Sequence, residues 1–178
     1  MSEDFRKIAI PTTAIAMTLL MIAPASLGAF AVGPIDTTRS GGLHFVGEPN
    51  LTVDKTDGAT LTVTGEVAGA GTGAGTATLA ATVEATVGCI TPSGSNEPQG
   101  LEDVRATVTA TAPFEPTRQG RAAFTVTTEP ITIEDFNFSC PSDRMTETLV
   151  GPITFVDPVL TISAQTGTIT ATFESIDP

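Results

Sequence analysis

The chain has 178 residues and a formal net charge of −12, from 20 acidic and 8 basic side chains. An acidic surface repels polyanions, so we expect no nucleic-acid partner. The chain contains no Trp, no Tyr and a single His. Sugar binding by ring stacking and metal binding by several imidazoles are therefore poor explanations of its function.

The N-terminal residues have the pattern of an export signal. Arg6 and Lys7 precede an uncharged apolar run, and Ala29-Phe30-Ala31 matches the A-x-A pattern of signal-peptidase sites. We expect residues 1–31 to be a signal peptide and residues 32–178 to form one domain. The alternative is an uncleaved anchor, because the run is long enough to span a bilayer. In both cases we expect a secreted or cell-surface protein, whose membrane contact is confined to this segment.

Alternation of apolar and polar residues predicts β-strands in the rest of the chain. Residues 51–54 and 59–67 flank a turn at Lys55–Gly58 and are predicted to form a hairpin. From Thr76 to Cys89 the odd positions hold Ala, Leu, Val or Cys, whereas the even positions are mostly Thr. This phase is typical of a strand with one buried face.

Four glycines precede that run, at positions 69, 71, 73 and 75. A dinucleotide-binding glycine loop opens a helix, and no segment after the N-terminal region has helical periodicity. We therefore interpret the glycines as a wide turn or bulge between two strands.

The same alternation recurs in five later segments, at 104–111, 124–127, 136–140, 160–162 and 169–173. Eight or nine strands separated by Gly and Pro turns predict an all-β fold. The expected architecture is a two-sheet antiparallel β-sandwich of Ig-like or Greek-key type. Small residues dominate the apolar positions, so its core should be thin.

Cys89 and Cys140 are predicted to form a disulfide. Both fall in the apolar phase of their segments, so we expect both on core faces of strands, where a bond between them would pin the two sheets together. Closing a loop of this length contributes about 4 kcal/mol in the chain-entropy model. The alternative is two buried, unpaired thiols.

Candidate catalytic groups are few. His44 lies in an alternating segment and is expected to be an exposed strand residue, and no Ser lies in a G-x-S-x-G turn. The carboxylate pairs Glu102-Asp103 and Glu134-Asp135 could serve a glycosidase if they converged in a cleft. The absence of Trp and Tyr argues against that activity, and we expect a protein that is not an enzyme.

Calcium is the more plausible ion, because it takes six to eight oxygen ligands that carboxylates and loop carbonyls supply. The candidate ligands are Asp54 and Asp57 at the first turn, and Glu97, Glu102 and Asp103 in the region after Cys89. They suggest an alternative function, a small-ligand or calcium-binding secreted protein that uses the acidic loop 91–103. Solvated turn acids explain the same residues, and no other cofactor is expected.

Two further patterns concern the surface. T-x-T runs are known from ice-binding solenoids, but a solenoid repeats them at a fixed interval, and here the intervals vary. Threonine is also a favourable exposed strand residue. Asn50 and Asn137 begin N-x-S/T sequons and are glycosylation candidates, with Asn137 expected to be exposed.

The segments HFVGEPNLTV, LTVTGEVAGAG and CITPSGSNEPQG resemble a family of small secreted proteins found mainly in actinobacteria. The resemblance covers roughly residues 44 to 128. It implies secretion and a β-rich fold, and it names no activity, because the family is uncharacterised. The lack of a catalytic motif, together with the export signal and the β fold, leads us to expect an extracellular or cell-surface structural or adhesive module, whose cell-wall or protein partner is unknown.

Overall fold

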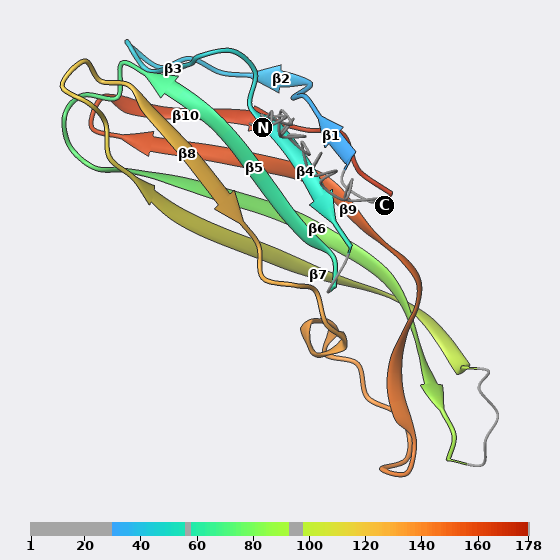
Figure 1. Ribbon diagram of the computed structural model, residues 1–178. Helices are drawn as coiled ribbons and strands as arrows, with labels where there is room; N and C mark the ends of the chain where they lie inside the picture. Colours follow the sequence, from blue (N-terminus) through green and yellow to red (C-terminus); the bar gives the residue numbers. More distant parts are fainter. Residues whose placement is uncertain (1–29, 56–57, 93–97, 178) are drawn as a thin grey trace, which may run out of the picture.

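The computed structural model describes residues 30–55, 58–92 and 98–177. In these ranges the chain forms two antiparallel sheets that pack face to face (Figure 1). The sequence prediction of an all-β, two-sheet sandwich is thus confirmed. No helix of the described ranges is long and apolar enough to cross a membrane.

The first sheet, sheet A, is built around β5. Its strands are β1 (Phe30–Val32), β3 (His44–Phe45), β4 (Asn50–Asp54), β5 (Thr60–Ala68) and β8 (Ala122–Thr127). The β4–β5 pair, with Val53 opposite Leu61, confirms the predicted hairpin. Val67 pairs with Phe45 on one side and with Ala122 on the other, so β3 and β8 lie on opposite edges of β5.

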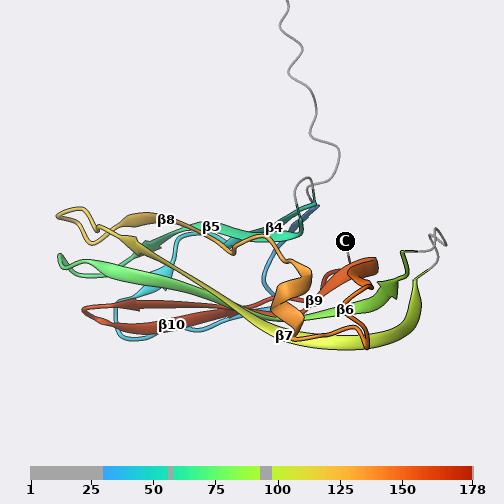
Figure 2. The ribbon, with the colours of Figure 1, turned by 90° about the horizontal axis from the view of Figure 1, so that it is seen from below.

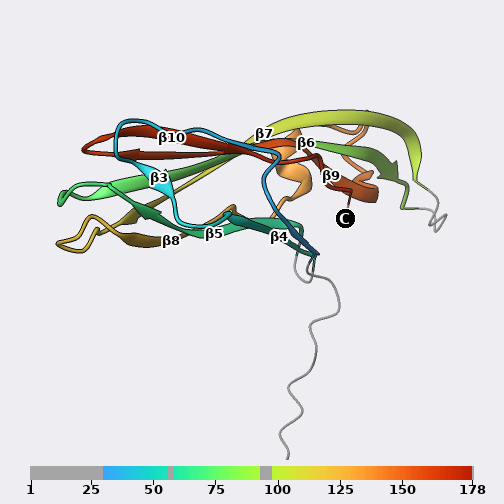
Figure 3. The ribbon, with the colours of Figure 1, turned by 90° about the horizontal axis from the view of Figure 1, so that it is seen from above.

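The second sheet, sheet B, has the strand order β2-β10-β9-β6-β7. Its strands are β2 (Asp36–Thr37), β6 (Gly75–Ile90), β7 (Gln99–Phe114), β9 (Thr146–Ala164) and β10 (Gly167–Thr172). β6, β7 and β9 are the longest strands, with 16, 16 and 19 residues. They continue and curve past sheet A, which covers only part of their length (Figures 2 and 3).

The core lies between the sheets and follows the alternation seen in the sequence. Every odd residue of β6 from Gly75 to Cys89 is buried, and every even residue except Gly88 is half-buried, as predicted. Phe155 of β9 and Phe173 are the largest fully buried side chains, and most other core residues are Leu, Ile, Val and Ala. The core is therefore formed mainly by aliphatic side chains of small and medium size.

The glycine-rich segment carries the chain from sheet A to sheet B. Gly69 and Gly71 have positive φ angles of 73° and 81°. A Cβ on Gly69 would lie 2.0 Å from the carbonyl oxygen of Gly42, so only glycine fits there. The predicted wide turn between strands is present, and no helix follows it.

The expected boundary between signal peptide and domain crosses a paired strand. Residues 1–29 lie outside the described ranges, but Phe30, Ala31 and Val32 of β1 pair with Val53, Thr52 and Leu51 of β4. Cleavage after Ala31 would remove Phe30 and Ala31 from sheet A. The boundary between residues 31 and 32 therefore stays a prediction. Cleavage there would remove two of the three β1 residues that pair with β4.

The predicted disulfide is present, but one of its two cysteines does not lie in a strand. Cys89 and Cys140 are bonded, with Cα atoms 5.9 Å apart. Cys89 is a buried residue of β6, whereas Cys140 is half-buried and lies in the β8–β9 connection. The bond therefore ties the far end of sheet B to a connection, and the prediction that it pins two sheets together is wrong.

The prediction failed because residues 136–140 do not form a strand. The 3₁₀ helix η1 (Ile133–Phe136) precedes Cys140, and Asn137 ends it in the left-handed region with a φ angle of 46°. The Asp135 carboxylate accepts hydrogen bonds from the backbone N and the Oγ1 of Thr132, at 2.7 and 3.1 Å. This local capping competes successfully with the strand pattern.

Candidate functional site

The outer face of sheet B carries most of the T-x-T residues, and we call it the threonine face. Its members are Thr76, Thr78 and Thr82 of β6, Thr107, Thr109 and Thr111 of β7, Thr161 and Ser163 of β9, and Thr168, Thr170 and Thr172 of β10. Each alternates with a buried or half-buried apolar residue, so these side chains point away from sheet A. These members carry no charge, whereas Glu84, Arg105 and Asp103 lie further along the same outer face of β6 and β7.

Strand pairing brings threonines from different strands into one row across the sheet. Thr78 pairs with Thr111 on one side and with Thr161 on the other, and Thr161 pairs with Thr170. Thr38, next to β2, continues the row, because its Oγ1 lies 3.2 Å from the Oγ1 of Thr170. We call these five residues the threonine rank. It spans sheet B from edge to edge.

The neighbouring rows are less regular. In the next row, Ala80 and Val159 pair with each other between Thr109 and Thr172. Sheet twist rotates each strand relative to its neighbour, so the hydroxyls do not form a flat lattice. The varying T-x-T intervals along the sequence thus produce one complete rank and incomplete neighbouring rows.

The acidic calcium candidates are dispersed. Glu102 and Asp103 are successive residues of β7, not loop residues, and successive strand residues point to opposite faces. Asp103 accepts a hydrogen bond of 2.8 Å from Thr86 Oγ1. Asp54 ends β4, whereas Asp57 and Glu97 lie outside the described residues. In the described part of the chain, no three His, Cys, Asp or Glu residues gather as a metal site.

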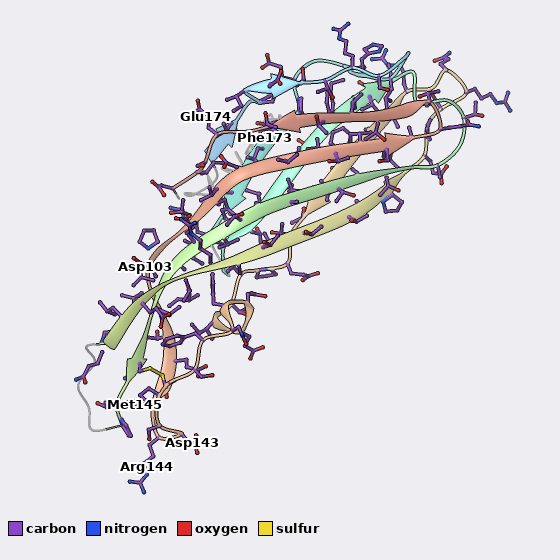
Figure 4. All side chains as sticks on the ribbon, turned by 180° about the vertical axis from the view of Figure 1, so that it is seen from behind. Asp103, Asp143, Arg144, Met145, Phe173 and Glu174 are labelled. Carbon is purple, nitrogen blue, oxygen red and sulfur yellow. A yellow bond between two sulfur atoms is a disulfide. The ribbon has the colours of Figure 1, made fainter. Side chains whose placement is uncertain are left out.

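Three of the carboxylates proposed for catalysis line three different hollows, and Glu134 is an exposed residue of η1. Asp103 lines a hollow of about 400 Å³ together with Glu84 and Arg105. Glu102 lines a second hollow, of about 360 Å³, beside the disulfide and Met145. Asp135 lines a third, of about 240 Å³, between β7 and the segment after β8. Figure 4 shows Met145 near one end of the molecule and Asp103 nearer its middle.

The remaining candidates lie at scattered positions. His44 is half-buried in β3, not exposed as expected, and its Nδ1 lies 2.8 Å from the carbonyl oxygen of Gly42. Asn50 is exposed at the start of β4. Asn137 is exposed as predicted, although it ends η1 and does not lie in a strand.

The threonine rank was not visible in the sequence. The T-x-T runs signalled outward-facing threonines, but their alignment depends on which strands become neighbours, and this is a long-range property. Comparison of the chain with protein-family models, curated proteins and solved structures finds no match.

Proposed function

We propose that the chain is an exported, non-catalytic β-sandwich that serves as a structural or adhesive module outside the cell or on its surface. The observation that carries the proposal is the threonine rank, an uncharged row of hydroxyls across a protein with a net charge of −12. Such a row offers donors and acceptors to an extended partner without attracting or repelling its charges.

Export is supported by two features that are independent of each other. The N-terminal residues follow the pattern of a signal peptide, and the described chain holds a disulfide. Disulfides persist in oxidising compartments and are rare in the cytosol of most cells. The resemblance to small secreted proteins points in the same direction.

A structural role accounts for the acidic residues better than catalysis or calcium binding does. The carboxylates of Glu102, Asp103 and Asp135 line three different hollows, so they do not assemble an acid–base pair. Asp135 caps a 3₁₀ helix and Asp103 binds a threonine hydroxyl. These contacts give both acids a role in the fold.

Fractionation of the producing cells tests the export part of the proposal. We expect the chain in the medium or in the wall fraction, and mass spectrometry of its N-terminus will show whether processing follows Ala31. A chain confined to the cytoplasm would overturn the proposal.

Binding to isolated envelopes of the producing cells tests the adhesive part. The double variant Thr78→Glu, Thr161→Glu introduces two charges into the threonine rank, and we expect it to weaken binding at least tenfold. The matched control is the double variant Thr64→Glu, Thr125→Glu, at two residues that are also cross-strand neighbours but lie in sheet A. Equal binding by the two variants would exclude the threonine rank as the contact surface.

A further inference from the structure

The outer edges of the two sheets differ greatly in length. β1, β3 and β8 border sheet A with three, two and six residues, and β2 borders one side of sheet B with two. The other side of sheet B ends in β7, which has 16 residues and pairs only with β6 among the described strands. An unpaired strand edge presents backbone N–H and C=O groups that another strand can bind.

The middle of this edge lacks the usual protection against pairing. Between Ala106 and Ala112 the sequence is ATVTATA, without a charged residue, Pro or Gly. The inward side chains of this segment and of the preceding Val104 contact the core but are only half-buried. They are Val104, Ala106, Val108, Ala110 and Ala112. A strand added at this edge would cover them and complete their burial.

The chain segment nearest to the edge does not close it. A hollow of about 240 Å³ is lined by Thr107, Val108 and Thr109 of β7 and, across from them, by residues 128–131 and Asp135. The segment that links β8 to η1 thus leaves space beside the centre of the edge. Inward side chains of an added strand could enter this space.

We propose that β7 pairs with β7 of a second copy of this chain, antiparallel and centred on Val108. The segment Ala106–Ala110 reads ATVTA in both directions, so this register places Ala opposite Ala and Thr opposite Thr. It also keeps all threonines on the outer face and all Val and Ala on the inner face, because every pair joins two odd-numbered or two even-numbered residues.

The charges along β7 are compatible with this register. Arg105 lies opposite Thr111 of the second copy, and Asp103 lies opposite Pro113, so no two like charges face each other across the pair. Each chain has one long edge, so the pairing closes after two copies and forms a dimer, not a fibre. The two threonine faces become continuous. This inference does not depend on the proposed export or adhesive role.

Sedimentation equilibrium of the purified chain at two salt concentrations tests the proposal. Each copy carries a net charge of −12, so repulsion should oppose pairing at low salt. Raising the salt from about 0.1 M to about 1 M shortens the screening length from about 10 Å to about 3 Å. We expect the dimer dissociation constant to fall at least tenfold over this range. A monomer at both salt concentrations overturns the proposal. That result would hold even if a different protein supplied the added strand.

Cysteine cross-linking tests the register. In the proposed pair, Val108→Cys places two thiols directly opposite each other, with Cα atoms about 4.5–5.5 Å apart, a distance that a disulfide can span. With oxidised glutathione we expect a covalent dimer linked through position 108, located by mass spectrometry. Ala112→Cys is the control, because it faces Val104 of the second copy. Equal cross-linking of both variants would contradict this register.

A substitution that protects the edge completes the test. Val108→Lys places an inward-pointing charge on β7, as natural edge strands do, and should abolish the dimer. Thr168→Lys adds the same charge on β10, away from this edge, and should leave the dimer intact. Circular dichroism checks that both variants are folded. A folded Val108→Lys variant that still dimerises would overturn the proposal.

Discussion

Two regions of sheet B have the same strand pattern but different means of stabilisation. In the two-layer part, sheet A covers sheet B, and residues such as Leu160 and Ile162 are fully buried. The single-layer end consists of residues 86–90, 99–103 and 146–150, which continue past sheet A (Figures 2 and 3). There, Val87 and Cys89 are buried outside the main hydrophobic cluster, and half-buried Leu149 packs against that cluster.

This difference shows that alternation by itself does not create a core. A strand face contributes to hydrophobic stabilisation only where a second layer removes it from water. At the single-layer end the covering element is the β8–β9 connection, and the disulfide between Cys89 and Cys140 fastens that connection to β6. A covalent bond thus stabilises the region where a second sheet is missing.

The largest expected effect comes from removing the disulfide. Replacing Cys89 and Cys140 with Ala opens a loop with a sequence separation of 51 residues. The chain-entropy model predicts a loss of about 4 kcal/mol in the free energy of unfolding, which urea denaturation would measure.

Hydrogen exchange shows where that loss is located. In the disulfide-free variant, amides of residues 86–90 and 146–150 should exchange faster, because local opening is governed by local stability. Amides of residues 77–83 should stay more protected than those at the single-layer end. A uniform increase along β6 would show that the two regions unfold as one unit.

A matched pair of core substitutions in β9 compares the regions directly. Leu160 is fully buried and pairs with Leu79, whereas Leu149 is half-buried and pairs with Val87. We expect Leu160→Ala to cost about 3 kcal/mol, within the usual range for a buried leucine. Leu149→Ala should cost about 1 kcal/mol, because it removes less buried area. Equal losses in urea denaturation would mean that the single-layer end is covered as well as the two-layer part.

A buried hydroxyl in the two-layer part provides a smaller effect. Thr128 is 4% exposed, and its Oγ1 accepts a 2.9 Å hydrogen bond from the backbone N–H of Leu61. Thr128→Val keeps the shape but leaves that N–H without its acceptor, which should cost about 1–2 kcal/mol. Thr127→Val is the control, because its hydroxyl is exposed and meets only Thr62 Oγ1, and it should cost less than about 0.5 kcal/mol. Equal changes in the free energy of unfolding would assign no role to the buried bond.

The sequence predicted the features that depend on neighbouring residues. The phase of β6 identified its buried face, including Cys89, because strand periodicity directly determines which side chains share a face. Cys140 was misplaced because the capping contact between Thr132 and Asp135 forms a 3₁₀ helix where alternation indicated a strand. Here a local polar interaction outweighed the apolar pattern.

Features that depend on sheet order could not be predicted. The threonine rank requires β6 to lie between β7 and β9, and this order joins segments far apart in the chain. Among the described strands, the same order leaves β7 as the long edge paired on one side only, and it places Glu102 and Asp103 in that strand. The extent of sheet A relative to sheet B is equally a property of the assembled fold, so the single-layer end had no sequence signal.

The smallest expected effect concerns two surface ion pairs, one on the outer face of each sheet. Glu84 binds Arg105 at 2.7 Å across β6 and β7, near the start of the single-layer end, and Glu66 binds Arg121 at 2.8 Å in sheet A. All four side chains are at least one-third exposed, so water screens both pairs. Glu84→Gln and Glu66→Gln should each lower the free energy of unfolding by about 0.5 kcal/mol or less, and about 1 M salt should remove the difference.

A loss above about 1.5 kcal/mol for Glu84→Gln alone would show that this pair, and not only the disulfide, stabilises the region where the second sheet ends. Equal small losses would show that coverage by a second layer governs apolar contacts and leaves exposed ion pairs unaffected.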